Sequence, residues 1–176
     1  MRLRQYPTAG QFAGIVLLLL ILWRVTHTPP EPADLPAEGL EVRVIRAVDG
    51  DTLLVEGDYR IRLFGVDTPE TKHPDRPEEP WGAEAYEFTK RRVEGKVVRL
   101  EFDRERQDPY GRWLAYVWID DSMLNEELIF EGYSEAETRF PFRGDRQRQF
   151  VKAEEAAREA GRGIWSTIPP PSKRME

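Results

Sequence analysis

The chain has 176 residues, enough for one domain with a hydrophobic core and additional segments. Hydrophobic residues make up 40% and charged residues 33%, a composition typical of globular rather than disordered proteins. The absence of cysteine excludes disulfides, thiolate zinc sites and cysteine nucleophiles, so any metal must be held by oxygen atoms or by the two histidines. The net charge of −6 argues against a protein that coats nucleic acid non-specifically, but an enzyme that cuts nucleic acid needs only a local positive cleft.

The first predicted segment, residues 1–27, is an apolar helix. Residues 5–23, nineteen in all, carry no charge and would span roughly 28 Å as a helix, close to the roughly 30 Å hydrocarbon core of a bilayer. Basic residues are more frequent before this run than after it, which predicts a single-pass membrane anchor with the following chain outside the cytoplasm. The same features fit a cleaved signal peptide, which would make the protein secreted, and a buried helix is a third interpretation.

The segments that flank the predicted domain are rich in proline. Residues 28–40 predict an extended, semi-stiff linker, and residues 168–176 predict a disordered tail. The domain itself is expected over residues 41–167.

The domain shows strand patterns first and helix patterns later. Alternating or short apolar runs predict five strands, at residues 42–48, 52–55, 59–64, 97–102 and 113–119. The turn Glu56-Gly57-Asp58 makes the second and third strands a hairpin. Helical periodicity predicts helices at residues 82–94, 123–131 and 146–160, and the last has one apolar face, formed by Phe150, Ala153, Ala157 and Ala160. This order suits an α+β domain, a five-stranded barrel of the OB type capped by three helices.

Two aspartates flank the predicted hairpin. Asp51 precedes its first strand and Asp67 follows its second, so antiparallel pairing would bring both to the same open end. There they could share a cation, with waters and a backbone carbonyl as further ligands. Oxygen ligands favour Ca²⁺, Mg²⁺ or Mn²⁺ over zinc.

A glutamate and two arginines complete the candidate site. Glu70 follows Asp67 by three residues, a position from which it could take a proton from an attacking water. Arg62 lies on the strand that leads to Asp67, and Arg112 follows the Tyr110-Gly111 turn. Each guanidinium can bind two phosphate oxygens and offset charge that develops on phosphorus. The pattern therefore predicts a site that hydrolyses phosphate esters.

Each of these pieces alone has an ordinary structural interpretation. Asp-Gly-Asp-Thr is a common turn sequence, an arginine on a strand is usually a paired or solvated surface residue, and Asp-Thr-Pro-Glu resembles a turn or a helix start. Their order and close spacing favour the catalytic interpretation. Lys72 could attract a polyanion, but Lys72 and His73 also fit a solvated loop of charges and prolines.

Five stretches of the sequence carry recognisable motifs: VDGDTLLV (48–55), IRLFGVDTPETKHP (61–74), WGAEAYEFTKRRVE (81–94), YGRWLAYV (110–117) and GIWS (163–166). Together they resemble the thermonuclease family, the staphylococcal-nuclease-like domains. The resemblance covers about residues 41–166. It implies an OB barrel with three helices and a Ca²⁺-dependent phosphodiesterase that cleaves DNA and RNA on the 5′-oxygen side of phosphorus, leaving 3′-phosphates.

Carried over by motif, the resemblance implies that Asp51, Asp67 and the carbonyl of Thr68 hold calcium. It also implies that Glu70 is the general base or orients the water, and that Arg62 and Arg112 bind the phosphate.

The departures from the family pattern concern substrate binding. Pro109 stands where the family's best-known member has a lysine, and Thr138 and Phe140 stand where that member has two tyrosines. Tyr110 remains a candidate to stack on a base or contact a phosphate. We expect a monomer whose substrate is DNA, RNA or both. The rival interpretation is a membrane-tethered OB module that binds nucleic acid or protein without cutting it.

Overall fold

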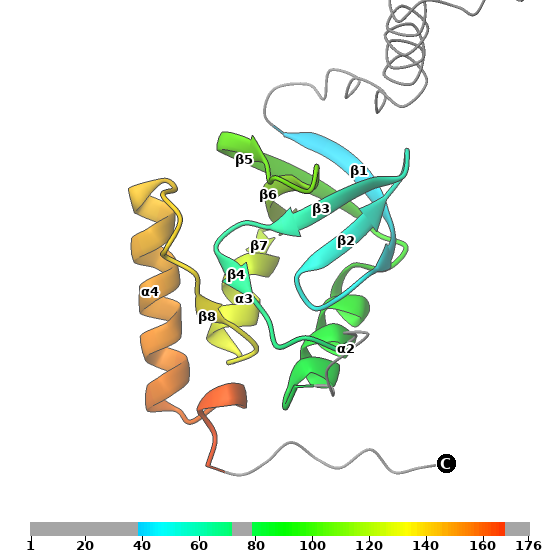
Figure 1. Ribbon diagram of the computed structural model, residues 1–176. Coiled ribbons are helices and arrows are strands. Elements are labelled where there is room, and N and C mark those ends of the chain that lie inside the picture. The colour runs from blue at the N-terminus through cyan, green and yellow to red at the C-terminus, as the bar shows by residue number, and fades with distance from the viewer. Residues whose placement is uncertain (1–38, 72–78, 168–176) are drawn as a thin grey trace, which may run out of the picture. The chain divides into compact units, whose positions relative to one another are not determined.

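A closed barrel forms the centre of the molecule. The computed structural model describes residues 39–71 and 79–167, and its largest sheet has the order β3-β2-β1-β5-β6-β7 (Figure 1). The barrel strands are β1 (Leu40–Ala47), β2 (Thr52–Val55), β3 (Tyr59–Leu63), β5 (Val97–Gln107) and β6 (Trp113–Ile119). Neighbours pair antiparallel, and a parallel pairing of β3 with β6 closes the barrel. The predicted five-stranded OB-type barrel is therefore confirmed.

Strand alternation determines which side chains fill the barrel and which face outward. In β3, Ile61 and Leu63 are buried, whereas Arg60 is exposed and Arg62 is partly exposed. Because successive side chains of a strand point to opposite faces, Arg62, one of the predicted site residues, lies outside the core. The core contains several fully buried side chains, among them Val44, Leu53, Leu100 and Tyr116.

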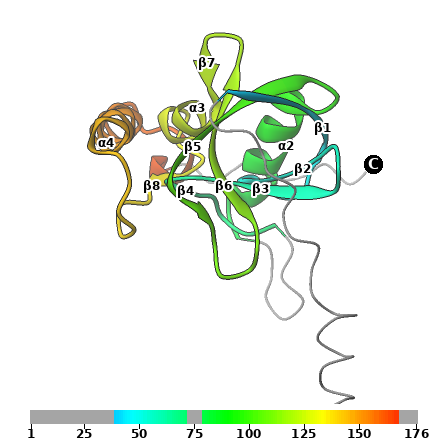
Figure 2. The same ribbon diagram turned by 90° about the horizontal axis from the view of Figure 1, so that it is seen from above.

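Three helices cover the barrel, as predicted. They are α2 (Gly82–Val93), α3 (Leu124–Phe130) and α4 (Gly144–Glu159), and each bound lies within two residues of the predicted one. Figure 2 shows α4 and α2 on opposite sides of α3. The apolar face of α4 buries Phe150, Ala153 and Ala157. Ala160 does not belong to that face: it is the exposed C-cap residue, because the helix ends at Glu159.

Short elements add features that the sequence pattern did not predict. Strands β4 (Val66–Asp67) and β8 (Glu135–Ala136) pair antiparallel in a separate two-stranded sheet. Strand β7 (Ser122–Met123) follows β6, and a 3₁₀ turn, η1 (Gly163–Trp165), follows α4. Strand β5 continues to Gln107, five residues beyond the predicted end, through a charged segment. A two-residue strand is too short to show a period, so local patterns miss it.

Several predicted segments lie outside the described residues. They are the apolar helix at 1–27, nearly all of the linker at 28–40, the tail at 168–176 and the loop that contains Lys72 and His73. The first described strand begins at Leu40. Within residues 39–71 and 79–167, no helix combines the length and apolar character that crossing a bilayer requires.

Candidate active site

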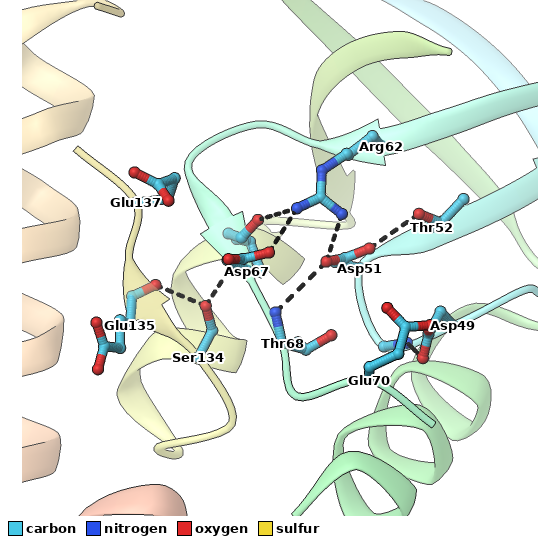
Figure 3. Close-up of polar contacts among 12 residues, drawn as sticks. Asp49, Asp51, Thr52, Arg62, Asp67, Thr68, Glu70, Ser134, Glu135 and Glu137 are labelled. Atoms are coloured by element: carbon cyan, nitrogen blue, oxygen red, sulfur yellow. Dashed lines mark hydrogen bonds and ion pairs between the residues drawn. The ribbon is translucent and has the colours of Figure 1, made fainter. Parts of the chain in front are cut away.

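The Arg62 guanidinium bridges the two aspartates of the predicted site (Figure 3). Its Nη1 lies 2.6 Å from Asp51 Oδ2, and its Nη2 donates to Asp67 Oδ1 at 2.8 Å. Nη2 also donates to the carbonyl of Val66 at 3.3 Å. The predicted meeting of Asp51 and Asp67 at the open end of one hairpin is therefore confirmed, with Arg62 between them.

The turn that carries Asp51 packs closely against the segment after β4. A Cβ at Gly50 would lie 2.6 Å from Thr68 Oγ1, so only glycine allows this approach. The Gly50 carbonyl accepts a hydrogen bond from Thr89 Oγ1 of α2 at 2.6 Å. The neighbouring Asp49 accepts one from Thr71 Oγ1 at 2.8 Å. These contacts hold the Asp51 turn between α2 and residues 68–71.

Asp67 is positioned by a distant part of the chain. It ends β4, where it pairs with Glu135 of β8. Its backbone N–H donates to Ser134 Oγ at 2.9 Å, and Ser134 Oγ in turn donates to the Glu135 carbonyl at 2.6 Å. Because Ser134 is fully buried, this hydroxyl fixes the backbone at Asp67 while the Asp67 side chain remains half exposed.

Burial and pairing oppose each other at Asp51. The residue is only 5% exposed, and desolvation raises the pKa of its carboxyl despite the attraction of Arg62 and the hydrogen bond from Thr52. Desolvation alone would lower the pKa of Arg62, but the charges of Asp51 and Asp67 outweigh it and raise that pKa. Arg62 therefore stays protonated. The buried Asp51 carboxylate depends on this neighbouring positive charge to remain ionised.

Arg112 is held by the turn between β5 and β6. Its Nε lies 2.6 Å from Asp108 Oδ2, and its backbone N–H donates to Asp108 Oδ1 at 3.0 Å. Gly111 occupies the left-handed region at φ +79°, which closes the turn. Partial burial alone would raise the pKa of Asp108, but hydrogen bonds from Arg112 and Tyr110 lower it. The Arg112 guanidinium also lies 5.6 Å from the centre of the Tyr110 ring.

A cleft of about 520 Å³ brings these groups together. Its lining includes Arg62, Asp67, Arg112 and Tyr110, so both predicted arginines and one predicted metal ligand face the same space. Tyr110 is 85% exposed there. Of the residues that depart from the family pattern, Pro109 and Phe140 line the cleft, whereas Thr138 is exposed and is not among the described lining residues.

The remaining predicted residues Asp51, Thr68 and Glu70 are not among the residues that line this cleft, and Lys72 lies outside the described chain. Thr68 follows Asp67, and its N–H points to Asp51 Oδ2 at 3.4 Å. In Figure 3, Glu70 lies on the same side of the Asp51–Arg62 pair as Thr68 and Asp49. Glu70 is exposed, and its backbone exchanges hydrogen bonds with Glu79 before α2. Lys72 belongs to the undescribed loop, so its predicted contact with substrate stays a prediction.

The residues present fit a hard cation. Asp51 and Asp67 offer carboxylate oxygens, and Thr68 Oγ1 beside them is buried without a hydrogen-bond partner in the described structure. Oxygen-only donors of this kind suit calcium better than zinc. In the described part of the chain, no cluster of three or more acidic or histidine side chains is positioned to coordinate a metal ion. A cation here would have two protein carboxylates and would share both with Arg62.

Sequence reasoning missed three charged residues of the cleft: Glu105 of β5, Glu137 and Arg139. Glu137 and Arg139 form an ion pair in the segment between β8 and α4, and Arg139 Nη2 lies 3.7 Å from Asp67 Oδ2. Figure 3 shows Glu137 near Asp67, on the β8 side. Only the pairing of β4 with β8 brings this segment to the site.

An OB-type barrel with two arginines and an aspartate around one cleft agrees with what comparison with known proteins shows. Residues 60–167 match the family model described as "Staphylococcal nuclease homologue". The chain is 39% identical over 155 residues to a thermonuclease of Staphylococcus hyicus, covering 86% of this chain and 91% of that protein. It is 36% identical over 168 residues to a thermonuclease of Staphylococcus intermedius, covering 93% of this chain and 99% of that protein.

A third relative is the SPbeta prophage-derived endonuclease YokF of Bacillus subtilis, 37% identical over 73% of this chain and 45% of its own length. The chain belongs to the staphylococcal nuclease family, as the sequence motifs predicted, and it is a nuclease, a hydrolase.

Proposed function

We propose that this nuclease is a calcium-dependent phosphodiesterase that hydrolyses DNA, RNA or both, breaking the bond between phosphorus and the 5′-oxygen. The observation that carries the proposal is the shared cleft of Arg62, Asp67, Arg112 and Tyr110. The products would be a 3′-phosphate and a free 5′-hydroxyl.

Calcium would be held by Asp51, Asp67 and the carbonyl of Thr68. When bound, it would supply positive charge that offsets the charge developing on the phosphate oxygens. Support comes from the oxygen-only donors, in which Asp51 and Asp67 share a single guanidinium, and from Thr68 Oγ1, which is buried without a hydrogen-bond partner in the described structure. Two protein carboxylates imply modest affinity, suited to surroundings where calcium is near millimolar.

The protein's own side chains would carry the remaining chemistry. Glu70 would accept the proton of the attacking water, which adds its oxygen to phosphorus, and the leaving 5′-oxygen would take up a proton as the bond breaks. Arg62 and Arg112 would bind oxygens of the scissile phosphate and stabilise the transition state. Their pairing with Asp51, Asp67 and Asp108 fixes both guanidinium groups before substrate arrives.

Substrate would be held by Tyr110, through stacking or a phosphate contact, and by Lys72 through charge attraction. The exposure of the Tyr110 ring at the cleft supports the first of these roles. We further propose a monomer, anchored by residues 1–27 with the nuclease domain outside the cytoplasm, or secreted after cleavage. The uncharged run at residues 5–23 supports this location. The intact mass of the mature protein would distinguish an anchored form from a cleaved one.

The test is hydrolysis of plasmid DNA and of RNA by the full-length chain, in calcium and in chelator, with analysis of the product ends. We expect calcium-dependent cleavage to 3′-phosphates and a loss of a hundredfold or more in Glu70→Gln, consistent with about 10²–10⁴-fold for a general base. Glu87→Gln, which removes an exposed carboxylate of α2, is the matched control. Undiminished cleavage in chelator would overturn the calcium dependence. Binding without cleavage under any metal would favour the non-catalytic module.

A further inference from the structure

Arg139 is the most exposed of the three arginines that line the cleft. The Arg62 and Arg112 side chains are 21% and 26% exposed, whereas that of Arg139 is 77% exposed. Arg62 is paired with Asp51 and Asp67, and Arg112 with Asp108. Arg139 is paired with Glu137, but most of its side chain is exposed to solvent at the cleft wall formed by the segment between β8 and α4.

We propose that Arg139 binds a phosphate flanking the scissile one and thereby selects substrates longer than a single phosphodiester. This proposal rests on the proposed nuclease mechanism, in which Arg62 and Arg112 bind the scissile phosphate.

Glu137 holds Arg139 in place. Arg139 Nε donates to both Glu137 carboxylate oxygens, at 2.9 and 2.8 Å, and the Arg139 backbone N–H donates to Oε1 at 2.9 Å. The Glu137 side chain is only 11% exposed, and its backbone N–H donates to the Gly65 carbonyl at 3.0 Å. The hydrogen bonds from Arg139 lower the pKa of Glu137, which keeps it ionised. A loop arginine is thus attached to the barrel beside β4.

Arg139 and Arg62 approach Asp67 through different oxygens. Arg62 Nη2 donates to Oδ1, while Arg139 Nη2 lies 3.7 Å from Oδ2. Because the two guanidinium groups use different oxygens of Asp67, Arg62 can bind one phosphate while the exposed Arg139 contacts the next phosphate of a strand. Glu137 is mostly buried while the Arg139 guanidinium is mostly exposed, so the pair holds a positive charge at the cleft surface.

The neighbour of Arg139 fits a bound strand. Phe140 is 60% exposed and lines the same cleft. Proteins that bind single strands combine cations along the backbone with exposed aromatic rings for the bases. Arg139 and Phe140, adjacent in the chain, offer one of each in the same cleft.

The test compares substrates that differ in phosphate number: a dinucleoside monophosphate, which has only the scissile phosphate, and a hexanucleotide. In Arg139→Gln we expect kcat/KM for the hexanucleotide to fall about tenfold, mainly through KM, in line with a charge-assisted hydrogen bond. The dinucleoside monophosphate should change less than twofold. The slope of log(kcat/KM) for the hexanucleotide against log salt should become shallower by about 0.7, the value for one phosphate contact to a single strand. Arg139→Lys should recover part of the loss.

Arg43→Gln is the control, because Arg43 is 54% exposed, pairs with Glu56 and does not line the cleft. It should leave both substrates and the salt slope unchanged. Equal losses on both substrates would place Arg139 at the scissile phosphate or the metal and overturn the proposal, as would wild-type behaviour of Arg139→Gln on the hexanucleotide. If the wild-type chain cleaves neither substrate, the proposed function fails. Arg139 is then tested by fluorescence anisotropy of a labelled hexanucleotide, where about tenfold weaker binding supports the contact and unchanged binding overturns it.

Discussion

Arg62 Nη1 forms an ion pair with Asp51 Oδ2 at 2.6 Å, and Asp51 is only 5% exposed. The carboxylate proposed to hold calcium and the guanidinium proposed to hold phosphate are therefore partners in the fold itself. Removing either residue leaves the charge of the other without its opposite partner in a largely buried position.

The first prediction concerns Arg62→Gln. This change leaves the Asp51 carboxylate buried without its cation, so we expect the free energy of unfolding to fall by about 3 kcal/mol in chelator. Calcium at the same carboxylates would replace the lost charge, so added calcium should stabilise Arg62→Gln more than it stabilises the wild type. Urea unfolding with and without calcium measures both effects. Arg43→Gln breaks two exposed contacts, the pair with Glu56 and a hydrogen bond to the Gly95 carbonyl, and should cost no more than about 1 kcal/mol. A calcium response no larger than that of the wild type would contradict the proposed metal position.

The second prediction concerns Ser134, whose buried hydroxyl accepts from the Asp67 N–H and donates to the Glu135 carbonyl. In Ser134→Ala the Asp67 N–H loses this partner, so we expect a loss of about 1–2 kcal/mol of stability and a several-fold weaker calcium affinity. Calorimetric titration with calcium, together with urea unfolding, provides the measurement. Ser122→Ala removes an exposed hydroxyl in β7 and should change neither quantity. Unaltered calcium binding in Ser134→Ala would mean that Ser134 does not position Asp67.

The third prediction concerns the close approach of Gly50 to Thr68. In Gly50→Ala the new Cβ would lie 2.6 Å from Thr68 Oγ1 and 3.0 Å from Thr68 Cβ, so the segment that carries Asp67 and Glu70 must shift. We expect turnover to fall at least tenfold, with a stability loss of about 1–3 kcal/mol. Gly144→Ala, where the nearest atom is a flexible Arg148 nitrogen at 3.5 Å, is the control. Kinetics at saturating calcium and substrate measure the effect, and full activity in Gly50→Ala would show that the turn can yield without moving the site.

The sequence allowed the hairpin part of the site to be predicted, but not the part that comes from β8. Asp51, Arg62 and Asp67 lie within seventeen residues on one hairpin, where strand pairing alone determines which side chains meet. Ser134 and Arg139 reach Asp67 across some seventy residues through β4 and β8, each two residues long. No local period marks such strands, so only the folded chain shows that they pair.

The last prediction concerns Asp103, which joins the end of the barrel to the start of α4. Its carboxylate accepts hydrogen bonds from the Arg143 N–H at 2.8 Å, the Arg104 N–H at 2.7 Å and the Tyr116 hydroxyl at 2.8 Å. Partial burial alone would raise the pKa of Asp103, but these hydrogen bonds outweigh it and lower the pKa. Because the folded pKa lies below the unfolded value of about 3.9, the stabilisation is present above pH 4 and is lost as pH falls through the folded pKa.

Asp103→Asn mimics the protonated side chain, so it should be less stable than the wild type at pH 7, by about 1–2 kcal/mol. That difference should shrink as pH falls below about 4, where the wild-type carboxyl also takes up a proton. Urea unfolding at pH 7, 5, 4 and 3 measures the convergence, and Asp121→Asn, at an exposed position after β6, should follow the wild type throughout. Arg143 is the N-cap residue of α4, and Arg139 and Phe140 lie just before it, so Asp103→Asn should also make that wall of the cleft more mobile. A gap between Asp103→Asn and wild type that stays constant down to pH 3 would mean that the Asp103 charge contributes nothing to the anchoring of α4.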